Sequence, residues 1–142
     1  MVEVEAIERS DEEWSKLLGD STFRVTRQHT TEPAFTGAYW DHKEEGVYRC
    51  ASCGNDLFLS AAKYDSGSGW PSYDRPVHTE NVGTTTDRTL FMSRTEVHCS
   101  RCKAHLGHVF DDGPPSTGQR YCVNSAALEF VELEEGAQED GR

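Results

Sequence analysis

The fold of this chain is decided by the stretch Val47-Tyr48-Arg49-Cys50-Ala51-Ser52-Cys53-Gly54, in which a strand-like run leads into a C-x-x-C turn. A second stretch of the same form, Glu96-Val97-His98-Cys99-Ser100-Arg101-Cys102, lies further along, and 45 residues separate the two turns. Each turn lets two sulfur atoms converge on one ion, so the pair predicts a closed, four-thiolate zinc site that joins distant parts of the chain. The predicted ligands of one structural zinc per chain are Cys50, Cys53, Cys99 and Cys102.

Two other uses of these cysteines are less favoured. A redox C-x-x-C needs only one pair and usually stands in a thioredoxin-like βαβ setting, which the flanking sequence lacks. Iron could occupy the same sulfurs, but a structural ribbon more often holds zinc. The sequence gives no sign of an organic cofactor.

The fifth cysteine, Cys122, stands outside both pairs in Arg120-Tyr121-Cys122-Val123-Asn124. Two imidazoles, His105 and His108, precede it by fewer than twenty residues. A thiolate with a nearby proton carrier is the equipment of a cysteine nucleophile. Two plainer interpretations remain open from these residues alone: Cys122 is an inert buried thiol, and the histidines are packing residues or a second metal pair.

Composition limits the classes of function. The 142 residues fit a single domain, and no apolar run approaches the ~20 residues of a membrane span. The acidic start of the chain lacks the order of a secretion signal, so we expect a cytoplasmic protein. The formal net charge of -11 disfavours binding to nucleic acid phosphates, although a salt-adapted host would also produce such acidity.

Local patterns predict a mainly β (α+β) domain. Ser10 and Glu13 form a capping-box pattern that begins a short helix over residues 11–18. The strand-like runs stand too close together for crossover helices, which favours antiparallel sheets. We predict an N-terminal extension over 1–8, a catalytic domain over 9–133 and an acidic disordered tail over 134–142. The predicted strands are 47–49, 57–59, 89–92, 96–98, 120–123 and 127–130.

Several long motifs, in order, resemble one family over residues 14–130, which is almost the whole chain. The family is methionine-R-sulfoxide reductase B (MsrB), and the four zinc cysteines match it as well. The motifs that carry the resemblance are His29-Thr30-Thr31-Glu32-Pro33-Ala34-Phe35-Thr36-Gly37, Lys63-Tyr64-Asp65-Ser66-Gly67-Ser68-Gly69-Trp70-Pro71-Ser72, Ala104-His105-Leu106-Gly107-His108-Val109-Phe110, Asp112-Gly113-Pro114 and Thr117-Gly118-Gln119-Arg120-Tyr121-Cys122-Val123-Asn124-Ser125.

The resemblance implies a β-tent fold of two antiparallel sheets with peripheral helices. It also implies an enzyme, a peptide-methionine (R)-S-oxide reductase, that acts on protein-bound or free methionine-R-sulfoxide in the repair of oxidised proteins. Carried over to this sequence, Cys122 is the nucleophile and becomes a sulfenic acid, while His105 and His108 are the imidazoles of the catalytic pocket. Trp70 is the wall for the substrate methyl group, and Asn124 helps to arrange water and hydrogen bonds around the site.

One departure from the family pattern concerns recycling. Many members carry a second reactive cysteine, in some of them in the Gly-x-Gly-Trp-Pro-Ser loop, where this chain has Ser68. Because the other four cysteines are the predicted zinc ligands, we expect an external thiol to reduce the sulfenic acid: thioredoxin, a glutaredoxin-type protein or a small thiol. A non-catalytic β-tent zinc module that binds a protein partner is the alternative, but it gives Cys122, the histidine pair and Trp70 no reason to occur together.

Overall fold

The computed structural model of the chain describes residues 9–28, 30–89 and 92–132. The predicted extension over 1–8 and the predicted tail over 134–142 lie outside these ranges, as does His29, so the domain limits stay predictions. Among the described helices, none combines the length and the apolar character needed to cross a membrane.

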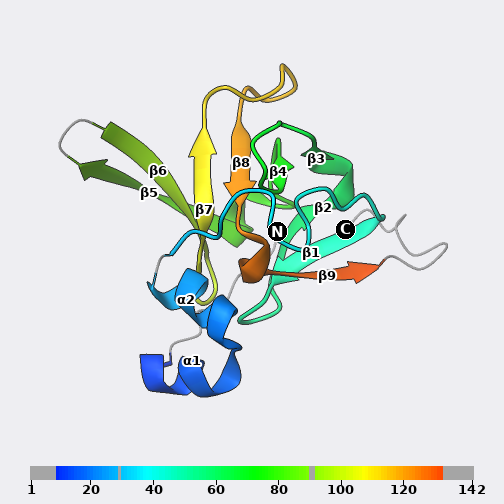
Figure 1. Cartoon of the computed structure of the whole chain (residues 1–142). Helices are drawn as coiled ribbons and strands as arrows, with labels where there is room; N and C mark the ends of the chain where they lie inside the picture. Colours follow the sequence, from blue (N-terminus) through cyan, green and yellow to red (C-terminus); the bar gives the residue numbers. More distant parts are fainter. Residues whose placement is uncertain (1–8, 29, 90–91, 133–142) are drawn as a thin grey trace.

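Two antiparallel sheets form the body of the molecule, as the sequence predicts (Figure 1). The smaller sheet has three strands in the order β2-β1-β9, and the larger has six in the order β3-β4-β8-β7-β6-β5. Strands β5 and β6 form a hairpin that projects from one side of the larger sheet (Figure 1). The strand bounds are β1 Gly46–Cys50, β2 Asp56–Leu59, β3 Lys63–Tyr64, β4 Ser72–Tyr73, β5 Val82–Thr89, β6 Met92–Cys99, β7 His105–Phe110, β8 Arg120–Val123 and β9 Leu128–Glu132.

The first helix, α1 (Asp11–Leu17), begins at the predicted capping box and ends one residue earlier than predicted. The Ser10 hydroxyl accepts the Glu13 amide at 3.2 Å, and the Glu13 carboxylate accepts the Ser10 amide at 2.9 Å. Trp14 is the buried residue of this helix. The reciprocal bonds satisfy amides that would otherwise lack partners in the first turn, which explains why so short a helix is defined.

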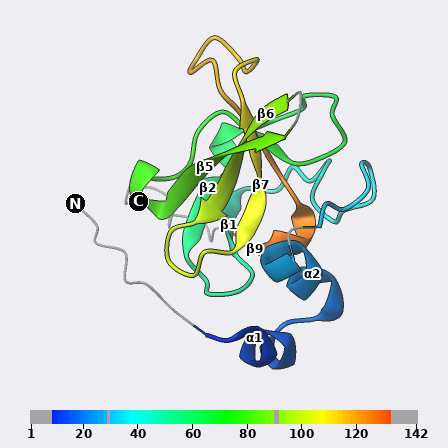
Figure 2. The same ribbon diagram turned by 90° about the vertical axis from the view of Figure 1, so that its left-hand side faces the viewer.

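The second helix, α2 (Asp20–Gln28), was not predicted from the sequence. Its Thr22, Val25 and Thr26 are β-branched and have low helix propensity, so the helix depends on tertiary contacts. Val25 and Thr26 are buried, and the Thr22 hydroxyl donates to the Ala126 carbonyl at 2.8 Å. Both helices lie together at one end of the molecule (Figure 2). Three short 3-10 turns, η1 Ser60–Ala62, η2 Thr79–Asn81 and η3 Ser125–Ala127, complete the elements.

One predicted strand, 89–92, is wrong. Thr89 ends β5 and Met92 begins β6, and the two residues pair with each other across the hairpin. The intervening residues carry no glycine, asparagine or proline to mark a turn, so the apolar run reads as one strand. The other predicted strands all lie within or overlap the observed ones.

The core lies where the two sheets meet. Tyr48 of β1 and Phe58 of β2 are fully buried, as is Tyr73 of β4 in the larger sheet. The rings of Phe58 and Tyr73 stack with centroids 4.3 Å apart. On β8, Val123 is fully buried in this core, and side chains alternate along a strand, so the neighbouring Cys122 faces away from it.

Candidate functional site

The four predicted ligand cysteines come together as one cluster. All four sulfur atoms lie within 4.8 Å of one another, and the Cys50–Cys102 and Cys53–Cys99 sulfur pairs are both 3.6 Å apart. Four thiolates around zinc at ~2.3 Å stand about 3.8 Å apart in a tetrahedron. The donor set and its spacing therefore fit a tetrahedral metal ion.

Two turns of the same design build this cluster. In the first, the Gly54 amide donates to the Cys50 carbonyl at 2.8 Å; in the second, the Lys103 amide donates to the Cys99 carbonyl at 2.9 Å. Each turn requires a left-handed backbone conformation at the residue four positions after its first cysteine. The φ angle is 81° at Gly54 and 67° at Lys103. Lysine at that place costs about 1–2 kcal/mol, which the surrounding structure has to offset.

Two side chains donate hydrogen bonds to the cluster. An Nη atom of Arg27, from α2, lies 3.2 Å from the Cys102 sulfur, and the Asn55 amide nitrogen lies 3.5 Å from the Cys99 sulfur. The Arg27 guanidinium carbon also stands 4.4 Å from the centroid of the buried Trp14 ring. Donors aimed at sulfur favour thiolate, which is the form that binds metal.

The fifth cysteine lies in a different environment on β8. The half-buried Cys122 sulfur has the Ser68 hydroxyl at 3.4 Å and the Ser72 hydroxyl at 3.8 Å. An Nη atom of Arg120 lies 3.2 Å from the same sulfur. The guanidinium thus places a positive charge beside this sulfur, whereas the other two contacts are neutral hydroxyls.

Arg120 is fixed by two further groups. Its Nε and Nη2 atoms donate to the two carboxylate oxygens of Asp112 at 2.9 and 3.2 Å, and the hydrogen bonds to Asp112 raise the pKa of Arg120. Its guanidinium carbon lies 4.4 Å from the Phe110 ring centroid. The sequence reasoning did not single out Arg120 as a site residue. Its place two residues before Cys122 on a strand, and so on the same face, was a signal that could have found it.

A cross-strand row places His108 beside Cys122. His108 of β7 is the register partner of Cys122 on β8, and Glu96 of β6 is the register partner of His108. On the other side, Ser72 of β4 is paired with Cys122. Directly opposed residues in antiparallel strands share a face, so the row Glu96, His108, Cys122, Ser72 lies on one surface of the larger sheet.

A β-bulge adds His105 to this surface. Residues three apart on a regular strand point to opposite faces, so His105 and His108 should be separated by the sheet. The pairing of β6 with β7 shifts between Val97 and His98, and Leu106 is left as the extra residue. As a result, His105 contacts the Glu96 carboxylate at 2.6 Å, and the two imidazole centroids are 5.6 Å apart.

Trp70 belongs to the loop that contacts Cys122. The Trp70 amide lies 3.4 Å from the Ser68 hydroxyl, which itself contacts the Cys122 sulfur. The indole nitrogen of Trp70 donates to the Glu32 carbonyl at 2.9 Å, and this bond fixes the orientation of the ring. The predicted substrate wall and the predicted nucleophile are therefore connected through one serine.

Asn124 is buried and makes its hydrogen bonds with the backbone. Its amide nitrogen donates to the Leu106 carbonyl at 2.9 Å, and its oxygen accepts the Glu32 amide at 3.0 Å. The Glu32 carboxylate in turn accepts the amides of Ser125 at 2.8 Å and Ala126 at 3.1 Å. Sequence reasoning gave Glu32 no role. In the structure it links the Trp70 loop to the segment that follows Cys122.

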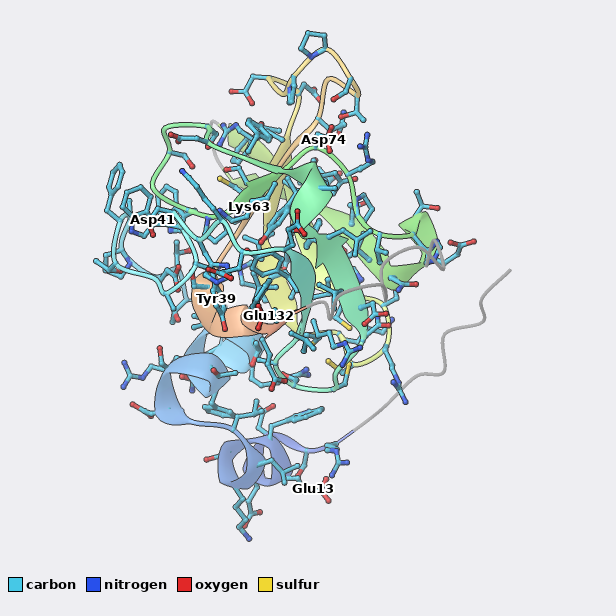
Figure 3. The ribbon with its side chains drawn as sticks, turned by 90° about the vertical axis from the view of Figure 1, so that its right-hand side faces the viewer. Glu13, Tyr39, Asp41, Lys63, Asp74 and Glu132 are labelled. Carbon is cyan, nitrogen blue, oxygen red and sulfur yellow. The ribbon has the colours of Figure 1, made fainter. Side chains whose placement is uncertain are left out.

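Two cavities border the site. A groove of about 470 Å³ is lined by both Ser68 and Arg120, the residues that flank the Cys122 sulfur. A smaller cavity of about 220 Å³ also has Tyr64 in its lining, together with Lys63 and Asp41, which are labelled in Figure 3. Burial lowers the pKa of Lys63, whose ammonium donates to the Trp40 carbonyl at 3.3 Å. Of these two cavities, the groove is the one whose described lining includes residues that contact the Cys122 sulfur.

Comparisons with known proteins place the chain among relatives. The SelR domain matches residues 18–132. A protein of Hahella chejuensis named peptide methionine sulfoxide reductase MsrB is 52% identical over 137 residues, covering 96% of this chain and 99% of the relative. Proteins of the same name from Herminiimonas arsenicoxydans and Thiobacillus denitrificans are 53% and 54% identical, covering 89% and 86% of this chain and 92% of each relative.

A solved structure shares the fold at lower similarity. The crystal structure of the Mis18 'Yippee-like' domain aligns with a TM-score of 0.51 and 19% sequence identity. The alignment covers 64% of this chain and 99% of that domain. At this identity the likeness concerns the fold alone.

Proposed function

The chain belongs to the MsrB family of peptide methionine sulfoxide reductases, and on this premise we propose that Cys122 is the nucleophile with which it reduces methionine-R-sulfoxide. The enzyme is an oxidoreductase, and a non-catalytic zinc module is not favoured by relatives that carry this name. The observation that carries the assignment is the surroundings of the Cys122 sulfur. An Nη atom of Arg120 lies 3.2 Å from this sulfur, and His108 is the register partner of Cys122 on the neighbouring strand.

The first step needs a nucleophile and an acid together. The Cys122 thiolate attacks the sulfoxide sulfur while the sulfoxide oxygen takes a proton, since an unprotonated sulfoxide is a poor electrophile. The oxygen then passes to the Cys122 sulfur, and the thioether leaves as methionine. The cysteine sulfur loses two electrons and becomes a sulfenic acid, and the substrate sulfur gains them.

We assign the proton donor to His108, the imidazole opposite Cys122 on the neighbouring strand. His105 is bound to the Glu96 carboxylate at 2.6 Å and lies beside His108. A carboxylate on one ring nitrogen fixes the tautomer and orientation of an imidazole. His105 and Glu96 are therefore positioning residues that support the acid.

Trp70 and Asn124 shape the pocket in this scheme. The Trp70 ring, held through its indole nitrogen, is the wall on which the substrate methyl group packs and is the source of selectivity between sulfoxide epimers. The buried Asn124 holds the bulged strand at Leu106 and the backbone of Glu32 in place. It supports the arrangement of polar groups and water around the site.

The four-cysteine cluster is proposed to hold one structural zinc. The ligands Cys50, Cys99 and Cys102 are almost fully buried, and four thiolates leave no open coordination position for a substrate. When bound, zinc supplies folding free energy and no chemistry. The proposed enzyme uses no organic cofactor.

An external thiol is proposed to reduce the sulfenic acid. The other four of the five cysteines are zinc ligands in this scheme, and withdrawal of one would dismantle the metal site. Thioredoxin, a glutaredoxin-type protein or a small thiol would serve as reductant. Location in the cytoplasm agrees with reduced cysteines, and the net charge of -11 disfavours nucleic acid and anionic membrane surfaces as partners.

Turnover of separated R and S methionine sulfoxides tests the proposal. We expect consumption of the R epimer in a blocked peptide, with free methionine-R-sulfoxide as a second substrate, and no consumption of the S epimer. Mass spectrometry after one equivalent of substrate should find the added oxygen, trapped by dimedone, on Cys122. Equal rates on both epimers, or an adduct on another cysteine, would contradict the assignment.

A further inference from the structure

We propose that the external thiol reaches Cys122 through the groove beside Ser68 and Arg120, and that Asp65 makes this groove select against anionic thiols. The inference rests on the proposed function of Cys122. It adds a binding site for the reductant and a rule for its charge.

The sheet gives the Cys122 sulfur two distinct sides. Strand β7, which carries His108, lies on one side of β8, and strand β4, which carries Ser72, lies on the other. The hydroxyls of Ser68 and Ser72 approach the sulfur from the β4 side, at 3.4 and 3.8 Å. Proton donation belongs to the first side, and the second side carries small polar groups.

The groove lies between the loop that precedes β4 and the loop that joins β7 to β8, so it approaches Cys122 along β8 from Arg120. It has a volume of about 470 Å³, and its lining includes Ser68 and Arg120, both of which contact the Cys122 sulfur. Its lining among the described residues includes neither of the two histidines nor Trp70. A small thiol in the groove is therefore next to two side chains that contact the sulfur, and it does not need to enter the pocket proposed for the sulfoxide.

The chemistry of the second step favours attack on the side of the sulfur away from His108. In this scheme the sulfenic oxygen comes from the sulfoxide and lies toward His108, the proposed proton donor. Displacement at sulfur proceeds with the incoming thiolate opposite the leaving oxygen. A new sulfur–sulfur bond forms as the sulfur–oxygen bond breaks, and the hydroxide leaves as water with a proton from the histidine side. A second thiolate then attacks the mixed disulfide, releasing the external disulfide and the Cys122 thiolate.

The charge of the groove depends on Asp65. Of the charged residues in the lining, Asp112 and Arg120 neutralise each other through two hydrogen bonds. The exposed Asp65 adds a negative charge at the rim, in a chain of net charge -11. Like charges at an entrance slow the arrival of an anion, and the effect fades as salt rises. An anionic thiol is therefore disfavoured here relative to a neutral or cationic one.

Asp65→Asn removes the charge and keeps the local structure. The Asp65 side-chain oxygen accepts the Gly67 amide at 2.9 Å, and asparagine offers the same acceptor. The matched control is Glu129→Gln, which removes one exposed carboxylate from β9 in the other sheet. Neither residue contacts Cys122 among the described interactions, so both variants should form the sulfenic acid at the normal rate.

The experiment follows the two half-reactions separately. One equivalent of methionine-R-sulfoxide is added without reductant, and released methionine is counted. The oxidised enzyme is then mixed at low salt with cysteamine, 2-mercaptoethanol or 3-mercaptopropionate, each at equal thiolate concentration. We expect Asp65→Asn to speed the anionic thiol about two- to fivefold, to slow the cationic thiol by a similar factor and to leave the neutral one unchanged. The differences should disappear in ~1 M salt.

Two outcomes separate this inference from the proposed function. Normal release of methionine, with Asp65→Asn and Glu129→Gln responding alike to all three thiols, would overturn the reductant groove alone. Failure to release methionine in the first step would overturn the assignment of Cys122 and the inference with it.

Discussion

The cysteines of this molecule occupy two regions that differ in the burial of the side chain and in the groups that surround its sulfur. At the proposed metal site, Cys50, Cys99 and Cys102 are at most 1% exposed, and each sulfur has other sulfurs as its neighbours. At the proposed active site, Cys122 is half-buried, and its neighbours are two hydroxyls and a guanidinium. A metal stabilises all four thiolates of a closed set, whereas a single cation stabilises one thiolate and leaves it open to attack. The accessibility of the sulfur atom, and not its thiolate character, therefore distinguishes a structural cysteine from a reactive one.

The largest effect should follow a change at the metal site. Cys99→Ser is expected to lose the metal and the cooperative thermal transition, because structural zinc contributes about 10–16 kcal/mol and a domain has about 5–15 kcal/mol of stability. Metal analysis and circular dichroism check both. A folded, metal-free variant with full activity would show that the two cysteine regions do not differ in role.

The second prediction concerns Cys122, whose substitution should remove activity without affecting the four-cysteine cluster. Cys122→Ser is expected to abolish reduction of methionine-R-sulfoxide, because a hydroxyl is a far weaker nucleophile at neutral pH. One zinc per chain and an unchanged melting curve should remain, since this residue lies outside the cluster. Activity near that of the unmodified enzyme would remove Cys122 from the mechanism.

The third prediction concerns the two histidines, which should distinguish a catalytic cysteine from an unreactive one by the rate of the first half-reaction. His108→Ala should slow the first half-reaction by ~10²–10⁴-fold through the loss of the proton donor. His105→Ala and Glu96→Gln should have smaller effects, because both act by orienting the acid. Single-turnover rates of methionine release measure all three. The reverse order of His105 and His108 would move the acid to His105.

The next prediction tests whether the Arg120 guanidinium stabilises a thiolate at Cys122, as a metal would do in the four-cysteine cluster. Arg120→Met should slow alkylation of Cys122 by iodoacetamide at neutral pH about 10–100-fold, because a hydrogen bond to a charged group is worth about 1.5–3 kcal/mol. Arg49→Met is a matched control, since Arg49 also binds an aspartate, Asp56, at 2.7 Å but in the other sheet. Equal alkylation rates in the two variants would mean that Arg120 does not stabilise the thiolate.

The smallest expected effect concerns Arg27, the cation at the metal site. Arg27→Met should increase the rate of zinc release to a chelator about two- to tenfold, because the variant loses the donor to Cys102 while keeping an apolar stem over Trp14. Arg24→Met, at an exposed position of the same helix, should release zinc at the normal rate. Identical release from both variants would leave Arg27 as a packing residue only.

Much of the molecule followed from local sequence signals. The paired C-x-x-C turns, the capping box at Ser10 and the β-rich texture were predicted and are present. Helix α2 was missed because its β-branched residues resemble strand sequence, and tertiary contacts such as burial of Val25 and the bond to Ala126 stabilise it. The apolar run over 89–92 was misread for the opposite reason, since the end of a hairpin without turn residues looks like one strand.

The assembly of the site depended on long-range register, which local patterns do not encode. The bulge at Leu106 brings His105 and His108 to one face although their spacing alone predicts opposite faces. Gly107 makes the close pairing with β8 possible, because a Cβ there would stand 1.9 Å from the Cys122 carbonyl oxygen. The resemblance to a family identified the residues of the candidate site, and the register of the sheet explains why they lie close together.

The two cysteine turns also set the order in which the molecule can assemble. Closing the 45-residue loop between Cys53 and Cys99 costs about 3–4 kcal/mol of chain entropy, and metal capture meets that cost early. The loop so closed contains Ser68 and Trp70, whereas Cys122 lies beyond it in the chain. With the proposed zinc bound, the segment that carries Trp70 is tethered before Cys122 joins it, so metal supply should govern how quickly new chains reach the folded arrangement of the proposed site.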